Sequence, residues 1–352
     1  MCSDVDWHDL IRKAIAMEAS DIHLTVGQKP HMRCLGILTP MDSCPLIEPV
    51  MKEIYSVILN DGQRELLTRT RETDLSWTFA GRRFRVHAYY QQGWPALAFR
   101  LLPERIPSLA ELMAPKAWQE MKEIDQGLIL VTGRTGSGKS TTLAAFIEEL
   151  NHEKPYHVVT LEDPIEYVFY PDKCFISQRE LGTDFYSFGN ALKGSLREMP
   201  DLVFVGEIRD YDTLATAFAA ASAGMLVLGT LHSAGAAEAV LRMEGMFPLE
   251  EQSCLRSLLA EVLQGIFAQR LVPTVNGGRT AVTEVLLANP AVRSLIRQGK
   301  YNQLASVMLS QQTTGMQTLA IAAQKLWQSG QIDRAVYDKL CNRQGGLYDV
   351  SL

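Results

Sequence analysis

One eight-residue segment constrains the fold of this chain more than any other feature. It reads Gly133-Arg134-Thr135-Gly136-Ser137-Gly138-Lys139-Ser140 and fits the pattern G-x-x-x-x-G-K-[ST] of a phosphate-binding loop. The segment follows a short apolar run and precedes a predicted helix over 141–150, which is the context that such a loop requires. A glycine-rich turn that binds no nucleotide is the alternative, and this context argues against it.

The residue types of the loop suit the binding of a nucleoside triphosphate. Glycines allow backbone N–H groups to point at a phosphate, and the N-terminus of the following helix adds positive potential. Lys139 is predicted to reach the outer phosphates of ATP, and Ser140 is predicted to hold Mg²⁺. With Thr141 at the start of the helix, the predicted nucleotide-binding residues run from Gly133 to Thr141.

From residue 126 onward, short apolar runs alternate with helical stretches. The predicted strands are 128–131, 157–161, 202–205 and 225–228, and after Pro290 the chain consists of polar helical segments. Fully apolar strands, each followed by a helix, are typical of a parallel sheet that is covered on both faces. The sequence therefore predicts an α/β domain with a helical part that begins at about residue 290.

The first hundred residues follow a different pattern, which predicts a small α+β domain. A helix is predicted over 7–19, and alternating segments at 75–79 and 84–88 flank Gly81 as the strands of a hairpin would. Prolines then punctuate the chain. We predict a first domain over 1–102, a linker over 103–112 and a second domain over 113–352.

Polar residues end the predicted strands of the second domain. Ligands of open parallel sheets lie beyond the carboxyl ends of the strands, so these residues can face the nucleotide. Glu207 is the stronger candidate for orienting or deprotonating the attacking water, and Glu162 is the second. Each carboxylate also has a structural interpretation, Glu162 as a turn cap and Glu207 as a surface partner of Arg209. His232 fits either a sensor of the γ-phosphate or a structural hydrogen-bond partner.

Composition excludes several other classes of protein. The net charge of −6 and the lack of a basic run disfavour nucleic acid as a partner. The six cysteines form no C-x-x-C pair, so we expect reduced thiols and no zinc knuckle. No apolar stretch is long enough for membrane insertion and the N-terminus has no export signal, which predicts a cytoplasmic protein.

Several longer segments resemble the secretion ATPase superfamily of type II and type IV systems. Residues 159–167 resemble its acidic box, 196–210 its Walker B segment and 228–233 its histidine box. Within that superfamily, residues 18–24, 83–86 and 291–300 are similar to segments of the PilT-type pilus retraction ATPases.

The resemblance implies a PAS-like first domain and a RecA-like ATPase domain that binds ATP and Mg²⁺. It also implies a homo-hexamer at the inner face of the cytoplasmic membrane, which acts on an inner-membrane platform protein of the pilus. In such a ring the first domain of one subunit supplies arginines to the nucleotide of another, and Arg83, Arg85 and Arg100 are the candidates. Arginines on a hairpin also commonly just solvate its outer face, which is the alternative.

Two positions depart from the patterns of these families. Gly206 stands where many P-loop enzymes place a magnesium-binding aspartate, so the metal is predicted to rely on Ser140, the nucleotide and water, with Glu207 reaching it through water. Met225 stands where the resembled family usually has an earlier histidine. The motor of another secretion or pilus assembly system is therefore the first alternative function. A nucleic-acid translocase and a scaffold that binds ATP without hydrolysing it are further alternatives.

Overall fold

The computed structural model describes residues 5–34, 36–41 and 43–342. The chain divides into two compact units: Met1–Arg105 together with Pro164–Tyr167, and Ile106–Asp163 together with Val168–Leu352. The division after Arg105 falls within the predicted linker 103–112. Nothing in the sequence suggested that the short segment Pro164–Tyr167 would group with the first unit.

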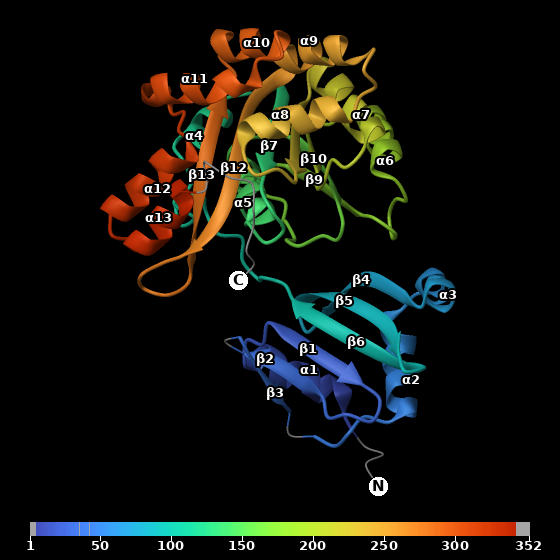
Figure 1. Cartoon of the computed structure of the whole chain (residues 1–352). Coiled ribbons are helices and arrows are strands. Elements are labelled where there is room, and N and C mark those ends of the chain that lie inside the picture. The colour runs from blue at the N-terminus through green and yellow to red at the C-terminus, as the bar shows by residue number, and fades with distance from the viewer. Residues whose placement is uncertain (1–4, 35, 42, 343–352) are drawn as a thin grey trace. The chain divides into compact units, whose positions relative to one another are not determined.

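A six-stranded antiparallel sheet forms the first unit, in the order β3-β2-β1-β6-β5-β4 (Figure 1). Its strands are β1 (Asp21–Thr25), β2 (His31–Cys34), β3 (Ile37–Pro40), β4 (Glu72–Phe79), β5 (Arg82–Gln91) and β6 (Trp94–Leu101). Its helices are α1 (Trp7–Ala16), α2 (Glu48–Ile58) and α3 (Asp61–Thr70). β4 and β5 form the predicted hairpin around Gly81, where Ala80 and Gly81 adopt φ of 50° and 76°.

Helix α1 is shorter than the sequence predicted. Asp6 caps it by accepting hydrogen bonds from the backbone N–H groups of His8 and Asp9. Its buried residues recur at the helical spacing and pack into the core of the first unit; they are Trp7, Leu10, Ile11 and Ala14. The helix ends at Ala16 rather than at residue 19 because Glu18 takes a left-handed φ of 51°.

The second unit contains a seven-stranded mixed sheet in the order β13-β12-β7-β11-β10-β8-β9 (Figure 1). Its strands are β7 (Gly127–Thr132), β8 (His157–Glu162), β9 (Phe175–Glu180), β10 (Leu202–Val205), β11 (Leu226–Leu231), β12 (Leu263–Pro273) and β13 (Arg279–Leu287). β7 to β12 pair in parallel, whereas β13 pairs antiparallel with β12. The α/β fold and all four predicted strands are confirmed, but the sheet is not purely parallel.

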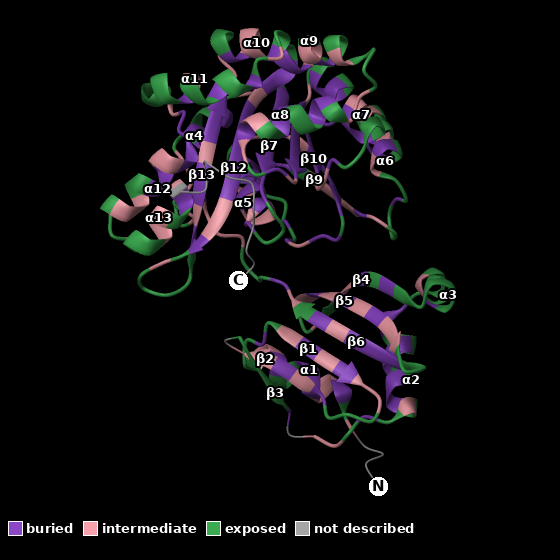
Figure 2. Ribbon diagram, in the orientation of Figure 1, coloured by how far each residue is buried: buried purple, intermediate pink, exposed green. Residues whose placement is uncertain are grey.

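Helices cover this sheet. They are α4 (Ala117–Met121), α5 (Lys139–Glu153), α6 (Phe188–Ser195), α7 (Tyr211–Ser222), α8 (Ala236–Gly245), α9 (Gln252–Val262), α10 (Pro290–Arg297), α11 (Leu304–Ser310), α12 (Leu319–Gln328) and α13 (Arg334–Asn342). Short 3-10 turns span Leu196–Glu198, Tyr301–Gln303 and Gln312–Thr314. α7 packs against β7 and β11, and α8 packs against β12 and β13. The central strands are consequently buried along their whole length (Figure 2).

Strands β9, β12 and β13 were not predicted. β9 and β13 are the two edges of the sheet, so each has partly exposed positions and tolerates polar residues that hide the apolar signal. β12 carries Gln264, Gly265, Gln269 and Arg270 among its apolar residues. β12 is buried because it pairs with β7 inside the sheet, and no local sequence pattern indicates this pairing.

The structure bears on two expectations from composition, the lack of a membrane-spanning segment and the state of the cysteines. None of the helices in residues 5–34, 36–41 and 43–342 could span a membrane. Free thiols occur at Cys34, Cys174, Cys254 and Cys341. Cys44 is disulfide-bonded, so the expectation of reduced cysteines is wrong there, because a spacing rule sees only local pairs. Cys2 lies outside the described residues.

Candidate nucleotide site

The phosphate-binding loop joins the carboxyl end of β7 to the N-terminus of α5. Gly133, Gly136 and Gly138 adopt positive φ of 151°, 75° and 85°, which only glycine tolerates readily. A Cβ on Gly133 would lie 2.4 Å from the carbonyl oxygen of Gln269 and 2.5 Å from the Ser137 hydroxyl. The glycines of the motif are therefore required by the backbone of the loop.

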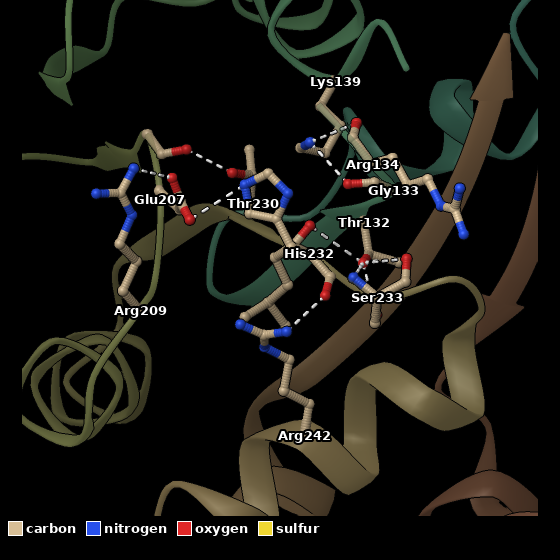
Figure 3. Close-up of polar contacts among 12 residues, drawn as sticks. Thr132, Gly133, Arg134, Lys139, Glu207, Arg209, Thr230, His232, Ser233 and Arg242 are labelled. Carbon is tan, nitrogen blue, oxygen red and sulfur yellow. Dashed lines mark hydrogen bonds and ion pairs between the residues drawn. The ribbon is translucent and has the colours of Figure 1, made fainter. Parts of the chain in front are cut away.

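Lys139 is buried in the loop, with 8% of its surface exposed. Its Nζ donates hydrogen bonds to the carbonyl oxygens of Gly133 at 2.8 Å and Arg134 at 3.1 Å (Figure 3). These bonds hold the ammonium group over the start of the loop. Lys139 is the first residue of α5, so the charge lies at the positive end of the helix.

Two further features fit a phosphate group. The N-cap of α5 is Gly138, which has no side chain to cap the helix, and phosphate groups commonly bind at a helix N-terminus of this kind. The Ser137 hydroxyl is buried and has no hydrogen-bond partner within the described residues. Ser140 and Thr141 are half-buried, while Arg134, Thr135 and Gly136 are exposed at the tip of the loop. The predicted binding residues thus form one continuous cradle.

Glu207 lies just beyond β10 and is held by two cationic or polar partners (Figure 3). Its Oε2 accepts a hydrogen bond from Arg209 Nη2 at 2.6 Å, and its Oε1 lies 3.1 Å from His232 Nε2. Burial by itself would raise the pKa of Glu207, but Arg209 and His232 outweigh it and lower this pKa below its usual value. The carboxylate therefore stays ionised at neutral pH, as a group that orients or activates water must.

The backbone around Glu207 is fixed by neighbouring strands. Gly206 N–H donates to the carbonyl of Leu161 at 2.7 Å, and Ile208 N–H donates to the carbonyl of Thr230 at 3.0 Å. A Cβ on Gly206 would lie 2.9 Å from that Leu161 oxygen and 3.2 Å from Glu162 Cα. The position where many P-loop enzymes have aspartate has no room for a side chain here.

Glu162 is the last residue of β8 and has only 7% of its surface exposed. It accepts hydrogen bonds from Thr160 Oγ1 at 2.7 Å and Gln178 Nε2 at 3.2 Å. In register, Leu161 pairs with Val205, and Leu231 pairs with Thr132. Since β7, β11, β10 and β8 are parallel neighbours, the phosphate-binding loop, His232, Glu207 and Glu162 all lie at the carboxyl ends of these strands.

Several known proteins are similar to this chain in sequence. A family model described as "Type II/IV secretion system protein" matches residues 108–277. The type IV pilus retraction ATPase PilT of Pseudomonas aeruginosa is 39% identical over 94% of this chain and 96% of its own length. A twitching motility protein of Neisseria gonorrhoeae is 46% identical over 86% of this chain and 82% of its own.

The chain belongs to the type II/IV secretion system protein family, in its PilT-type branch. Solved structures agree with this assignment. A crystal structure of the pilus retraction motor PilT with bound ADP superposes with a TM-score of 0.90 at 41% identity, covering 96% of this chain and 97% of that one. The ATPase DotB of Legionella pneumophila gives 0.85 at 28% identity, covering 96% and 95%.

The arginines assigned from the PilT-type resemblance lie on the sheet of the first unit. Arg83 donates through Nη2 to the Ser76 hydroxyl at 2.7 Å. Arg85 Nε lies 3.9 Å from Asp74 Oδ1, on the same hairpin. Arg100 Nε donates to Asp21 Oδ1 at 3.1 Å. Each arginine has a partner within its own unit, and a role in trans stays a prediction.

Met225, where PilT-type relatives were expected to have histidine, lies at the other end of the strands, before the first residue of β11. It immediately precedes β11, and its carbonyl oxygen accepts a hydrogen bond from Gly127 N–H at 2.9 Å. Gly127 begins β7, whereas the phosphate-binding loop follows the other end of that strand. Met225 is thus separated from the loop by the length of β7.

Gln269 contacts the phosphate-binding loop but was not among the site residues predicted from the sequence. It lies on β12, and its side chain exchanges hydrogen bonds with the Thr142 hydroxyl at 3.0 and 3.2 Å. Its amide nitrogen would lie 3.2 Å from a Cβ on Gly138, so it packs on the loop. No local signal could identify Gln269, because the pairing of β12 with β7 brings it there.

Proposed function

We propose that this chain is an ATP-hydrolysing motor that powers the retraction of a type IV pilus. The observation that carries the proposal is that the phosphate-binding loop and an ionised Glu207 both follow the carboxyl ends of strands in one sheet, in a chain 39% identical to a pilus retraction ATPase over nearly its whole length. The relative crystallised with ADP supports a nucleotide at this loop. The acidic net charge of −6 gives no support to a nucleic-acid translocase.

In this proposal the loop residues bind the phosphates and the strand ends prepare the water. Lys139 and the N–H groups at the start of α5 bind the outer phosphate oxygens, and the Ser137 hydroxyl, which has no hydrogen-bond partner among the described residues, gains an acceptor. Ser140 would hold Mg²⁺, which neutralises charge that develops on the phosphates. Glu207 orients the attacking water, and Glu162 is the second acidic group at the carboxyl ends of the strands.

The finer parts of the proposal concern assembly. We propose a homo-hexamer in which Arg83, Arg85 and Arg100 reach the nucleotide of a neighbouring subunit, since such arginines stabilise transition-state charge. The ring would lie at the inner face of the cytoplasmic membrane, against an inner-membrane platform protein of the pilus. A motor of another secretion system is the second candidate, which the similarity to DotB at 28% identity favours.

Purified protein with Mg²⁺ and ATP provides the direct test. Glu207→Gln should abolish turnover while ATP affinity stays within about threefold of wild type, because the substitution removes only the carboxylate charge. Glu120→Gln changes an exposed acid of α4 and serves as the control, with unchanged turnover expected. Unchanged turnover in Glu207→Gln would refute the assignment of Glu207.

A deletion strain tests the biological direction of the motor. We expect cells that carry pili but do not retract them, with recovery by the wild-type gene and none by the Glu207→Gln gene. Normal retraction together with a secretion defect would favour the second candidate.

A further inference from the structure

The hydroxyl group of Thr132 makes an unusual set of contacts at the end of β7. It accepts a hydrogen bond from Ser233 N–H at 2.9 Å, lies 2.6 Å from the Ser233 hydroxyl, and lies 3.0 Å from the Ser233 carbonyl oxygen (Figure 3). The Leu231 carbonyl oxygen is 3.2 Å away. Thr132 is fully buried and Ser233 is 4% exposed, so these bonds form out of contact with water.

Side chains of α8, β12 and β13 bind the backbone of the segment from His232 to Ala236. Arg242 of α8 donates to the carbonyl of His232 at 2.8 Å. Further along, the partners are Glu238 on Ala234 N–H at 3.0 Å, Arg270 on the Ala234 carbonyl at 3.3 Å and Glu284 on Ala236 N–H at 2.8 Å. None of these four side chains is fully buried. By contrast, Thr132 and Ser233 are both buried, so the hydrogen bonds between them are shielded from water.

This contact joins two parts of the nucleotide site. Thr132 is directly followed by Gly133, the first residue of the phosphate-binding loop, and Ser233 is directly preceded by His232. His232 in turn lies 3.1 Å from the carboxylate of Glu207. One hydroxyl therefore connects the backbone that leads into the loop with the backbone that carries the histidine.

We propose that Thr132 is a positioning residue for ATP hydrolysis, which holds His232 against Glu207 in a fixed relation to the phosphate-binding loop. The inference rests on the proposed function. It follows from the sensitivity of turnover to small displacements, since an error of about 1 Å in a reacting group can cost about 100-fold in rate. Thr132 does not touch the reacting atoms, and its effect is transmitted through Ser233 and His232.

The test compares Thr132→Val, which keeps the shape of the side chain and removes the hydroxyl, with Thr132→Ser, which keeps the hydroxyl. In Thr132→Val, the buried N–H of Ser233 loses its acceptor and the segment shifts. We expect kcat to fall about 10-fold or more, with the Kd for ATP within about threefold of wild type. Thr132→Ser should keep kcat within about threefold of wild type.

Ser233→Ala provides a second, milder variant, because it removes one hydroxyl and leaves the backbone N–H of residue 233 on Thr132. We expect kcat to fall about threefold, and the double variant with Thr132→Val should be no slower than Thr132→Val by itself, since both act through one contact. Multiplying effects in the double variant would contradict this.

Three results would overturn the inference: wild-type kcat in Thr132→Val, an equal loss of kcat in Thr132→Ser, or a Kd for ATP that weakens in parallel with kcat. The last would show that Thr132 only supports the folding of the loop. Failure of the proposed function is distinguished from these, because it would appear as absent turnover in the wild-type protein and would remove both claims.

Discussion

The substitution Gly206→Ala tests the close approach of β10 to β8 beside the two acidic residues of the site. The new Cβ would lie 2.9 Å from the carbonyl oxygen of Leu161, a distance that Cβ atoms essentially never show, and 3.2 Å from Glu162 Cα. Both neighbours are backbone atoms of a central strand, so no change of rotamer relieves the contact. The strand ends must move apart by several tenths of an ångström.

The expected cost follows from two opposing terms. Overpacking of this kind costs about 1–3 kcal/mol, and the contact with rigid backbone places it toward the upper end. Replacing glycine by alanine recovers about 0.4–1 kcal/mol through the unfolded chain. We therefore expect a net loss of about 1–2.5 kcal/mol in the free energy of unfolding. The same shift displaces Glu207, so kcat should fall about 10-fold or more.

Urea unfolding followed by circular dichroism measures the stability, and a steady-state assay measures kcat. Gly194→Ala is the matched control, because a Cβ there meets no atom within 4 Å in helix α6. It should be neutral or stabilising by about 0.4–1 kcal/mol, with unchanged kcat. If Gly206→Ala behaved like Gly194→Ala in both measurements, the steric argument would be refuted.

Three further substitutions give independent checks. Arg209→Ala removes a group that lowers the pKa of Glu207, so this pKa rises and the acidic limb of the kcat–pH profile should move to higher pH; an unmoved limb would contradict the role of Arg209. Trp118→Ala should destabilise the chain by about 3–5 kcal/mol in urea unfolding, because the ring is fully buried and stacks on Phe267 at 4.0 Å. Tyr55→Phe should cost about 1–3 kcal/mol by the same assay, since the buried N–H of Ala96 loses the Tyr55 hydroxyl as its acceptor; a loss below about 0.5 kcal/mol would argue against this contact.

Local rules explain which parts of the fold were predictable. The four predicted strands lie inside the sheet and are largely buried, so each contains a short apolar run in the sequence. The edge strands β9 and β13 have exposed positions, and they escaped prediction for that reason. Helix α1 was predicted three residues too long, because the left-handed turn at Glu18 carries no glycine to mark it.

The sequence by itself determined the phosphate-binding loop, because its glycines, Lys139 and Ser140 are fixed by the backbone conformation of one short segment. It also indicated that Glu207 and Glu162 end their strands. Only the tertiary structure decided that Glu207 lies between Arg209 and His232, and that Thr132 bonds to Ser233, which is 101 residues away in the chain. The physical reason is that such contacts depend on the order and register of the strands, which are set by the packing of the whole sheet and by no local pattern.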